Sequence, residues 1–396
     1  MIPVAEARAR ILSGLRPVSA ETVALAEACG RVTAAAVTSR LTQPPEDVSA
    51  MDGYAVAGPS PWRLVGHAPA GHPWEGRLEP GQTVRLFTGS IVPAGAEAVV
   101  IQEDVTVDGE MVASGVTIRP GQHIRPRGQD FAAGQMLLPE GRVLTPRDIG
   151  LLAASNHPWV TVRRRPRIAI LATGDEIALP GEPIPPGGIV SSNAHALAAL
   201  VQQAGAVPVV LPIASDDLET LRAAAAGARG CDLLVTTGGA SVGAHDLVAE
   251  ALQAAGLVLD FWTIAMRPGK PLMWGRVGDL PMLGLPGNPV SALVCGLLFL
   301  RPVIAALLGL PAEAPPVTRA VLGADLPAND RRADHLRARL VPDSQGALVA
   351  TAFTRQDSGQ LRTLAESDAL ILRAPHAPAA LAGETVDILL LGPLGV

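Results

Sequence analysis

The sequence is poor in aromatic residues and in cysteine. Aromatic residues make up 3% of the chain, with Tyr54 as the single tyrosine, and only three cysteines occur. Cys29 and Cys231 stand alone and Cys295 lies within an apolar run, so no spacing indicates a metal site or a disulfide framework. This cysteine usage fits a reducing, cytoplasmic environment best.

An excess of basic charge and an apolar targeting segment are also missing. The formal net charge is -6 and the isoelectric point is near 5.8, which argues against a nucleic-acid-binding protein. The N-terminus mixes charged residues at helical spacing and has no apolar signal core. The strongly apolar stretch Pro289–Leu310 contains Arg301 and Pro302, so we expect a core helix and no membrane span.

The length of 396 residues predicts roughly two to four domains. At the start, helices are expected at Val4–Leu12 and Ala20–Ala28, the second stopped by Gly30. Asp52-Gly53 between apolar residues predicts a hairpin turn, and on structural grounds this turn alone is sufficient to explain Asp52. From there to about residue 140, short β-branched runs predict a small β-rich domain, with strands at Thr83–Phe87, Ala98–Gln102 and Gly115–Arg119.

A different pattern begins after Thr145. Pro146 and Asp148 follow this residue as in a capped helix start, which predicts a helix at Pro146–Ser155. From Arg167 to about Leu310, strands and helices alternate, which predicts a doubly wound parallel sheet. The expected strands are Ile168–Ala172, Val207–Leu211, Leu233–Val235, Val258–Ile264 and Leu283–Leu285, and the expected helices are Ser192–Ala204, Asp216–Ala226, Asp246–Ala255 and the helix after Pro289.

The loop after the Leu233–Val235 strand is rich in glycine. Gly238, Gly239 and Gly243 can adopt positive φ and let backbone N–H groups converge on an anion, most plausibly a phosphate. Glycine-rich turns are also common for geometric reasons alone, so by itself this loop indicates ligand binding only modestly.

Ligands of doubly wound sheets bind at the carboxyl ends of the strands, and several charged loops meet there. Arg267 and Lys270 supply cations. Carboxylates beside a phosphate need a bridging ion, and Mg²⁺ is the usual one. Each acid alone fits a helix cap or a solvated charge better, and only their convergence predicts metal-assisted phosphate chemistry; these acids are Asp175, Glu176, Asp216, Asp217 and Asp246.

A proline-rich linker at Pro311–Pro316 leads to a final segment of short alternating strands. Leu336–Leu340, Leu348–Ala352 and Val386–Leu391 are the expected strands, and they predict a second small β domain.

Several separated motifs resemble one family, the molybdopterin molybdenumtransferases, which also includes the E domain of gephyrin. The resemblance covers essentially the whole chain. The motifs are Ser49-Ala-Met-Asp-Gly-Tyr-Ala-Val56, Phe87-Thr-Gly89, Arg125 with Gly128 and Asp130, Thr173-Gly-Asp-Glu176, Gly238-Gly-Ala-Ser-Val-Gly243 with Asp246, Pro268-Gly-Lys-Pro271 and Leu285-Pro-Gly-Asn-Pro-Val-Ser291.

The resemblance implies a multidomain α/β plus β fold. Its parts are an elongated domain (1–40 and 141–165), a β-rich insert (41–140), a molybdopterin-binding α/β domain (166–310) and a C-terminal β-barrel (311–396). It further implies a homodimer in which each active site draws on the other subunit's Asp52 region. The implied reaction is the insertion of molybdate into adenylylated molybdopterin with release of AMP, and the implied cofactor is Mg²⁺. A molybdopterin adenylyltransferase is the implied delivery partner, and no nucleic acid or membrane is involved.

The resemblance also implies roles for individual residues. The catalytic set is Asp52, Thr88, Asp130, Glu176, Asp246 and Lys270, and the metal ligands are Glu176, Asp246 and Asp216. The substrate-binding set is Gly238, Gly239, Ser241, Gly243, Arg267, Pro271, Pro286, Pro289, Ser291, Arg337 and Ser358. The sequence departs from the usual family pattern at Arg267, where lysine is common, at Gln129, where glutamate is common, and at Ala244-His245.

Three other functions compete with this one. A molybdopterin adenylyltransferase resembles residues 166–310, but its loop normally reads Gly-Gly-Thr-Gly and it lacks the flanking β domains. A general nucleotide hydrolase is weaker, because the sequence has no Gly-x-x-x-x-Gly-Lys-Ser/Thr motif. The non-enzymatic alternative is a scaffold, as in the receptor-clustering role of gephyrin, and measured AMP release would distinguish it from a transferase.

Overall fold

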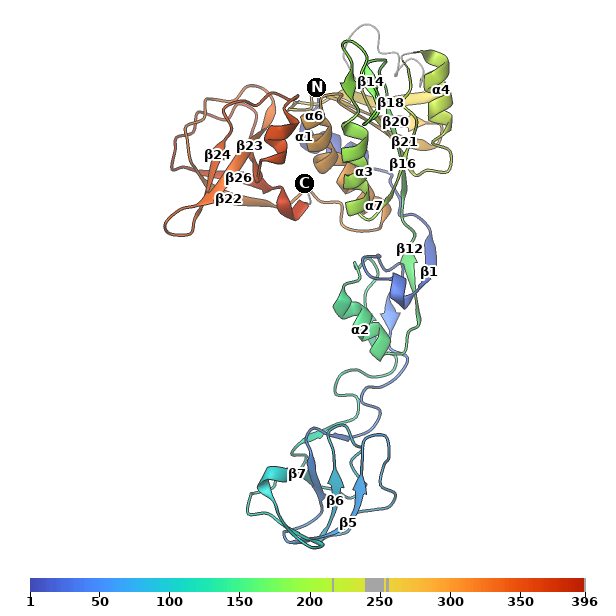
Figure 1. The fold of residues 1–396 in the computed structure, drawn as a ribbon, viewed down its shortest axis with the longest axis vertical. Coiled ribbons are helices and arrows are strands. Elements are labelled where there is room, and N and C mark those ends of the chain that lie inside the picture. The colour runs from blue at the N-terminus through green and yellow to red at the C-terminus, as the bar shows by residue number, and fades with distance from the viewer. Residues whose placement is uncertain (216, 239–252, 254–255, 395–396) are drawn as a thin grey trace. The chain divides into compact units, whose positions relative to one another are not determined.

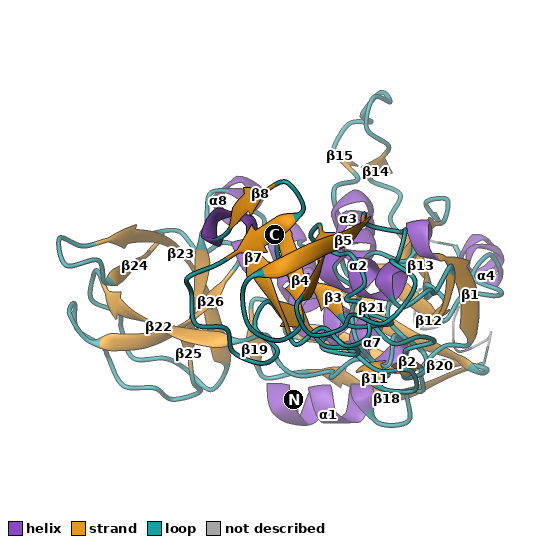
Figure 2. Cartoon of the chain, turned by 90° about the horizontal axis from the view of Figure 1, so that it is seen from below, coloured by secondary structure: helices purple, strands orange, loops and turns teal. Residues whose placement is uncertain are grey.

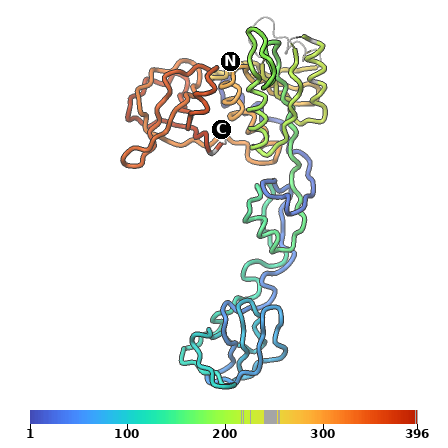
Figure 3. Tube along the Cα trace, in the orientation of Figure 1, coloured from blue at the N-terminus to red at the C-terminus, as the bar shows by residue number. Residues whose placement is uncertain are grey.

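The computed structural model describes residues 1–215, 217–238, 253 and 256–394. The chain forms two compact units, which we call unit 1 (Met1–Glu21 and Arg163–Val396) and unit 2 (Thr22–Val162). Unit 1 therefore contains both ends of the chain, and unit 2 is inserted between them, as the trace in Figure 3 shows.

The larger part of unit 1 is an α/β domain around a six-stranded sheet (Figure 1). Its strand order is β16 (Val207–Val210), β13 (Arg167–Ala172), β17 (Leu233–Thr237), β21 (Leu280–Leu285), β20 (Pro271–Val277) and β18 (Leu257–Thr263). The first four strands are mutually parallel, and β20 runs antiparallel to both of its neighbours. The predicted doubly wound sheet is confirmed, but β20 was not expected as a strand.

Helices cover both faces of this sheet. On one face, α4 (Leu218–Ala226) packs Leu221 against Ala169, Leu171 and Leu234. On the other, α3 (Asn193–Gln203) packs against β13, β16, α6 and α7. Successive side chains of β13 point to opposite faces of the sheet, and both sets are hydrophobic. Because helices cover both faces, the whole strand after Arg167 is buried.

The last helical segment of the domain is continuous and apolar. It consists of α6 (Pro289–Cys295), the π-helical turn η3 (Gly296–Leu300) and α7 (Arg301–Leu307), and α1 (Val4–Leu12) packs against α7. Pro289–Leu307 is long and apolar enough to cross a membrane, but 83% of the tested window is buried inside the protein. This burial is typical of a core helix, as expected from the sequence.

The C-terminal part of unit 1 is a closed five-stranded barrel (Figure 2). Its strands are β22 (Val317–Leu322), β23 (Ala333–Pro342), β24 (Leu348–Ala352), β25 (Ala369–Arg373) and β26 (Thr385–Leu390). Pairing of β23 with β25 closes the barrel, which leaves no free sheet edge. The helix α8 (Leu361–Ala365) and the 3₁₀ turn η4 (Gly392–Leu394) complete it.

Two backbone contacts join the barrel to the α/β domain. The short strand β19 (Met266–Arg267) pairs in parallel with the start of β23, with Arg267 opposite Asp334. At the other contact, the amide of Val290 at the start of α6 donates to the carbonyl of Ser358, 3.1 Å away. Both contacts involve segments that the sequence assigned to the site.

Unit 2 contains a second six-stranded sheet. Its order is β7 (Ala98–Ile101), β4 (Gly53–Val56), β6 (Gln82–Leu86), β5 (Trp62–Ala68), β9 (Met111–Ala113) and β8 (Thr106–Asp108). The 3₁₀ turn η2 (Gln102–Asp104) follows β7. The expected strand at Gly115–Arg119 is wrong, because these residues form no strand.

The predicted Asp52-Gly53 hairpin is also wrong. β4 pairs with β6 and β7, while the preceding strand β3 (Val48–Ser49) pairs with β10 (Ile124–Arg125). A Cβ atom at Gly53 would lie 2.1 Å from the carbonyl oxygen of Val100. Glycine is therefore required here for the close approach of two strands, and no reverse turn requires it.

The rest of unit 2 surrounds the helix α2 (Pro146–Ala154), whose predicted start is confirmed. Thr145 and Asp148 form a complete capping box at its N-terminus. Beside it, β2 (Val37–Thr38) pairs with β11 (Met136–Leu138), and β1 (Ala20–Ala24) pairs with β12 (Trp159–Arg163). The helix expected at Ala20–Ala28 is therefore wrong: this segment is β1 followed by the 3₁₀ turn η1 (Leu25–Glu27).

Candidate functional site

A cleft of about 730 Å³ opens at the carboxyl edge of the α/β sheet. β13, β17 and β21 end there with Ala172, Thr237 and Leu285, and β20 begins there with Pro271. The lining comes from these strand ends, from the short strands β14 (Ile177–Ala178) and β15 (Ile189–Val190), from the starts of α3 and α6, and from the barrel segment at the start of α8. The lining residues are Ala172, Glu176, Ile177, Ile189, Val190, Ser191, Ser192, Asn193, Thr237, Gly238, Pro271, Pro286, Gly287, Asn288, Pro289, Ser291, Gly359 and Leu361. The edge is the one that the sequence predicted.

A hydrogen-bond network fixes the wall of the cleft formed by the Pro286-Gly287 segment. The side-chain amide of Asn193 donates to Thr237 Oγ1 at 2.9 Å and to the carbonyl of Gly287 at 2.7 Å. Thr237 Oγ1 in turn donates to the carbonyl of Pro286 at 3.3 Å. Neither Asn193 nor Thr237 was predicted as a site residue, although Asn193 lies at the start of the expected helix Ser192–Ala204.

Glu176 is the carboxylate that the structure places at the cleft. Glu176 follows a tight turn at Gly174, which has φ +140°. A Cβ atom at Gly174 would lie 2.5 Å from Glu176 Oε2, so the glycine leaves room for the Glu176 carboxylate. Gly238 also requires glycine, because it has φ +96° and a Cβ there would lie 2.4 Å from the carbonyl oxygen of Thr173. Asp175 lies on the other side of this turn, in a separate cleft with Glu182 and Ser215.

An apolar arm forms another part of the lining. It consists of β14 (Ile177–Ala178) and β15 (Ile189–Val190), which pair in parallel. Ile177, Ile189 and Val190 line the cleft beside its polar residues. Apolar walls with a few fixed polar groups are typical of sites for organic ligands. The arm was not predicted, since two-residue strands leave almost no periodic signal.

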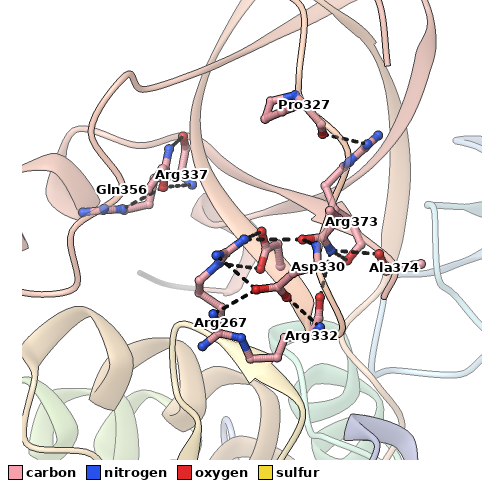
Figure 4. A network of polar contacts seen from close by, with 10 residues as sticks. Arg267, Pro327, Asp330, Arg332, Arg337, Gln356, Arg373 and Ala374 are labelled. Carbon is pink, nitrogen blue, oxygen red and sulfur yellow. Dashed lines mark hydrogen bonds and ion pairs between the residues drawn. The ribbon is translucent and has the colours of Figure 1, made fainter. Parts of the chain in front are cut away.

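Arg267 and Arg337, both expected to bind substrate, are engaged elsewhere (Figure 4). Arg267 Nε donates to Asp334 Oδ1 at 2.8 Å, and its guanidinium also pairs with Asp334 Oδ2 and Asp330. The hydrogen bond and the charge of Asp334 raise the pKa of Arg267. Arg337 is 1% exposed, and burial lowers its pKa. Neither residue is part of the cleft lining.

The guanidinium of Arg337 donates four hydrogen bonds to the loop that precedes α8. The acceptors are Gln356 Oε1 at 3.3 Å and the carbonyls of Gln360, Asp357 and Arg355 at 3.0, 2.9 and 3.4 Å. This loop carries Ser358 and Gly359, and Gly359 lines the cleft. Arg337 thus shapes the barrel side of the cleft from within the barrel.

Lys270 is the only lysine in the sequence. Lys270 is half-buried and directly precedes Pro271 of the cleft lining. Its backbone carbonyl accepts a hydrogen bond from the amide of Ile264 at 3.0 Å. Among the described residues, no ion-pair partner of its ammonium group is found. That thirty arginines accompany a single lysine is a signal in the composition that would have singled out this position.

Some of the other predicted site residues lie in the part of the chain that the structure describes, and others do not. Pro286, Pro289 and the buried Ser291 line the cleft with Pro271, Glu176 and Gly238. Asp217 binds the start of α4, where hydrogen bonds from Ser215 and Thr220 lower its pKa to about 2. Five predicted residues lie outside the described residues: Asp216, Gly239, Ser241, Gly243 and Asp246.

Asp52 and Thr88 form one cluster in unit 2. Asp52 Oδ1 accepts from the amide of Thr88 at 2.7 Å and from its hydroxyl at 2.9 Å. These two bonds, the backbone one first, lower the pKa of Asp52. Beside them, the guanidinium of Arg85 lies over the ring of Tyr54 at 4.8 Å and the ring of Phe87 at 5.2 Å. Asp130 is exposed, and its amide donates to the carbonyl of Gln43 at 3.0 Å.

One described residue of the cleft has the donor chemistry of a magnesium ligand. Glu176 supplies carboxylate oxygens, which together with phosphate oxygens are the ligands that Mg²⁺ prefers. Within the described part of the chain, no group of three or more His, Cys, Asp or Glu side chains could hold a metal ion. The two other predicted metal ligands, Asp216 and Asp246, lie outside that part.

The fold and cleft define a multidomain protein in which a barrel loop contributes to the cleft of the α/β domain. Three family models match: "MoeA N-terminal region (domain I and II)" at residues 2–155, "Probable molybdopterin binding domain" at 169–306 and "MoeA C-terminal region (domain IV)" at 319–391. The chain belongs to the molybdopterin molybdenumtransferase family and is a transferase of molybdenum cofactor biosynthesis.

Individual relatives cover most of the chain. A molybdopterin molybdenumtransferase from Nostoc is 38% identical over 368 residues, which are 88% of this chain and 84% of the relative. Molybdopterin molybdenumtransferase 2 from Mycobacterium tuberculosis is 38% identical over 92% of both chains. The crystal structure of a molybdopterin biosynthesis MoeA protein from Pyrococcus horikoshii superimposes with a TM-score of 0.87 at 27% identity, covering 98% of this chain and 99% of that one. The predicted family and fold class are confirmed.

Proposed function

We propose that the protein inserts molybdate into adenylylated molybdopterin and releases AMP. The observation that carries this proposal is the cleft itself, which combines apolar walls, a carboxylate and backbone positions held open by required glycines at one sheet edge. Such a site suits a ligand that has both a ring system and a phosphoanhydride. The alternative function, an adenylyltransferase, would give no role to the two regions that flank the α/β domain and match the N-terminal and C-terminal family models, residues 2–155 and 319–391.

The residues would act mainly by positioning and charge neutralisation. Lys270 would stabilise phosphate or molybdate oxygens, while Ser291 and Ser358 orient the oxyanion. Glu176 would hold Mg²⁺ together with Asp216 and Asp246, and the ion would neutralise charge on the phosphate oxygens. Gly238, with Gly239, Ser241 and Gly243, would cradle the phosphate.

Three further elements of the proposal concern the assembly. The active protein would be a homodimer in which Asp52, with Thr88 and Asp130, completes the site of the partner subunit. The substrate would come from a molybdopterin adenylyltransferase, and the reaction would take place in the cytoplasm. The exposed position of the Asp52 and Thr88 cluster supports this proposal, because such a cluster is accessible to another chain.

The test is molybdate-dependent AMP release from adenylylated molybdopterin. Lys270→Met removes the charge, and losing a preorganised charge at a developing anion lowers the rate on the order of a hundredfold. Arg276→Met is the matched control, because Arg276 is an exposed cation of β20 whose guanidinium binds only the carbonyl of Asp279 among the described hydrogen bonds. Equal AMP release by the two variants would contradict the proposed role of Lys270.

A further inference from the structure

The ion pair between Arg267 and Asp334 lies where the barrel meets the segment that leads to Lys270 (Figure 4). The Asp334 side chain is 5% exposed and that of Arg267 is 46% exposed. Asp334 accepts from Arg267 through both carboxylate oxygens, and Asp330 lies 3.5 Å from a third nitrogen of the same guanidinium. Two-point contact between carboxylate and guanidinium fixes direction as well as distance. Arg267 is therefore held by the barrel and is not among the residues that line the cleft.

The backbone carries this constraint toward Lys270. Met266 and Arg267 pair with Ala333 and Asp334 in the β19–β23 register, and the amide of Ala333 donates to the carbonyl of Ala265 at 2.9 Å. Three residues after Arg267, the carbonyl of Lys270 accepts from Ile264 at 3.0 Å and closes the loop on its other side. The loop 264–270 is thus attached to the barrel through β19 and closed by the hydrogen bond between its two ends.

The middle of this loop rests on the core helix. Gly269 has φ +108°, and a Cβ there would lie 2.5 Å from Cys295 Sγ and 2.7 Å from Met266 Cε. Cys295 is fully buried in α6, and the turn at Gly269 packs directly against it. The loop is closely packed between β23 and α6, so we infer that a change at Arg267 is transmitted along it to Lys270.

We propose that Asp334 is a positioning residue: it holds Arg267 and thereby sets the place of Lys270, which directly precedes the cleft residue Pro271. This inference rests on the proposed function only in that Lys270 acts on the substrate. A displacement of about 1 Å in a catalytic group costs on the order of a hundredfold in rate, so breaking the pair from the barrel side lowers turnover without touching the cleft. The barrel then acts on the reaction through β19 as well as through the Ser358 loop.

The single lysine makes this proposal directly measurable. Reductive methylation with ¹³C-formaldehyde labels only Lys270 and the N-terminal amine, and the Lys270→Arg protein identifies which NMR signal belongs to the lysine. Asp334→Asn keeps an oxygen for Arg267 Nε and removes the charge. The control is Asp387→Asn, since Asp387 forms an exposed ion pair with Arg319 at 3.9 Å elsewhere on the barrel.

We expect Asp334→Asn to shift the Lys270 signal and to lower the AMP release of the unmethylated enzyme tenfold or more, with substrate KM nearly unchanged. Asp387→Asn should do neither. Arg267→Gln breaks the same pair from the exposed side and should reproduce both effects, which keeps the test available if Asp334→Asn fails to fold. An unmoved Lys270 signal, or a moved signal with normal AMP release, overturns the proposal. Lys270→Met tests the proposed function separately, because it alone decides whether the lysine is needed.

Discussion

Arg337→Ala is the substitution for which the structure gives the largest and most specific expected effect. The side chain is 1% exposed, and two of its acceptors, the carbonyls of Gln360 and Asp357, are bonded at 3.0 and 2.9 Å. Both bonds are part-buried and have a charged donor, and such a bond contributes about 1.5–3 kcal/mol, so the variant should lose roughly 3–6 kcal/mol in its free energy of unfolding. The cavity left by the side chain adds to this loss.

The matched control lies two residues further along the same strand. Arg339 is 58% exposed in its side chain and pairs with Glu366 at 3.0 Å, so Arg339→Ala should cost about 0–1 kcal/mol. Urea unfolding followed by circular dichroism measures both values. The Ser358 loop is built on Arg337, so we also expect Arg337→Ala to lower molybdate affinity even in molecules that remain folded. Equal unfolding free energies for the two variants, or unchanged molybdate dependence of AMP release, would refute the reasoning.

Three other predictions follow from single features. Thr237→Val removes the hydroxyl that links Asn193 to Pro286 and should weaken nucleotide binding, measured by calorimetry, by about tenfold to a hundredfold. Thr237→Ser keeps the hydroxyl and should bind normally. Equal affinities of the two variants would contradict the role of this hydrogen-bond network. Burial lowers the pKa of His335 to about 4, so as the pH falls the unfolded chain binds a proton before the folded protein does. The contribution of neutral His335 to the free energy of unfolding is complete above about pH 6.5 and falls by about 1.4 kcal/mol per pH unit toward pH 4. His335→Gln should reduce this slope, as measured by urea unfolding at about pH 7 and about pH 5.5. Mixing an Asp52→Asn subunit with a Glu176→Gln subunit should restore part of the AMP release if the two residues act across a dimer, and a mixture with proven subunit exchange that stays inactive would contradict the shared site.

The features predicted correctly from the sequence are those determined locally. The start of α2 depends on Thr145 and Asp148, three residues apart, so its signal is contained in one turn of chain. The buried strands β13 and β17 are continuous apolar runs that have no alternative place in a folded protein. Because parallel strands end at one edge, finding the strands also located the cleft.

The incorrect predictions concern residues whose partners are distant in sequence. The segment at Ala20–Ala24 has helix-forming residues, but pairing with β12, more than a hundred residues later, makes it a strand. Gly53 and Arg267 were interpreted from their neighbours, yet the carbonyl of Val100 and the carboxylate of Asp334 determine their roles. No pattern within a short window contains these contacts.

The state of the two arginines changes which group is expected to attract the substrate's anions. Arg267 faces the two carboxylates of Asp334 and Asp330, so this cluster has no net positive charge to offer. Arg337 is a buried cation whose donors already bind a side-chain oxygen and three carbonyls, and most of its hydrogen-bonding capacity is used within the barrel. We therefore expect the attraction of molybdate or phosphate to come chiefly from Lys270 and from backbone N–H groups at the strand ends. Lys270 is the single lysine among thirty arginines, and a compact ammonium next to the tight turn at Gly269 is better suited than a planar guanidinium to approach an oxyanion there.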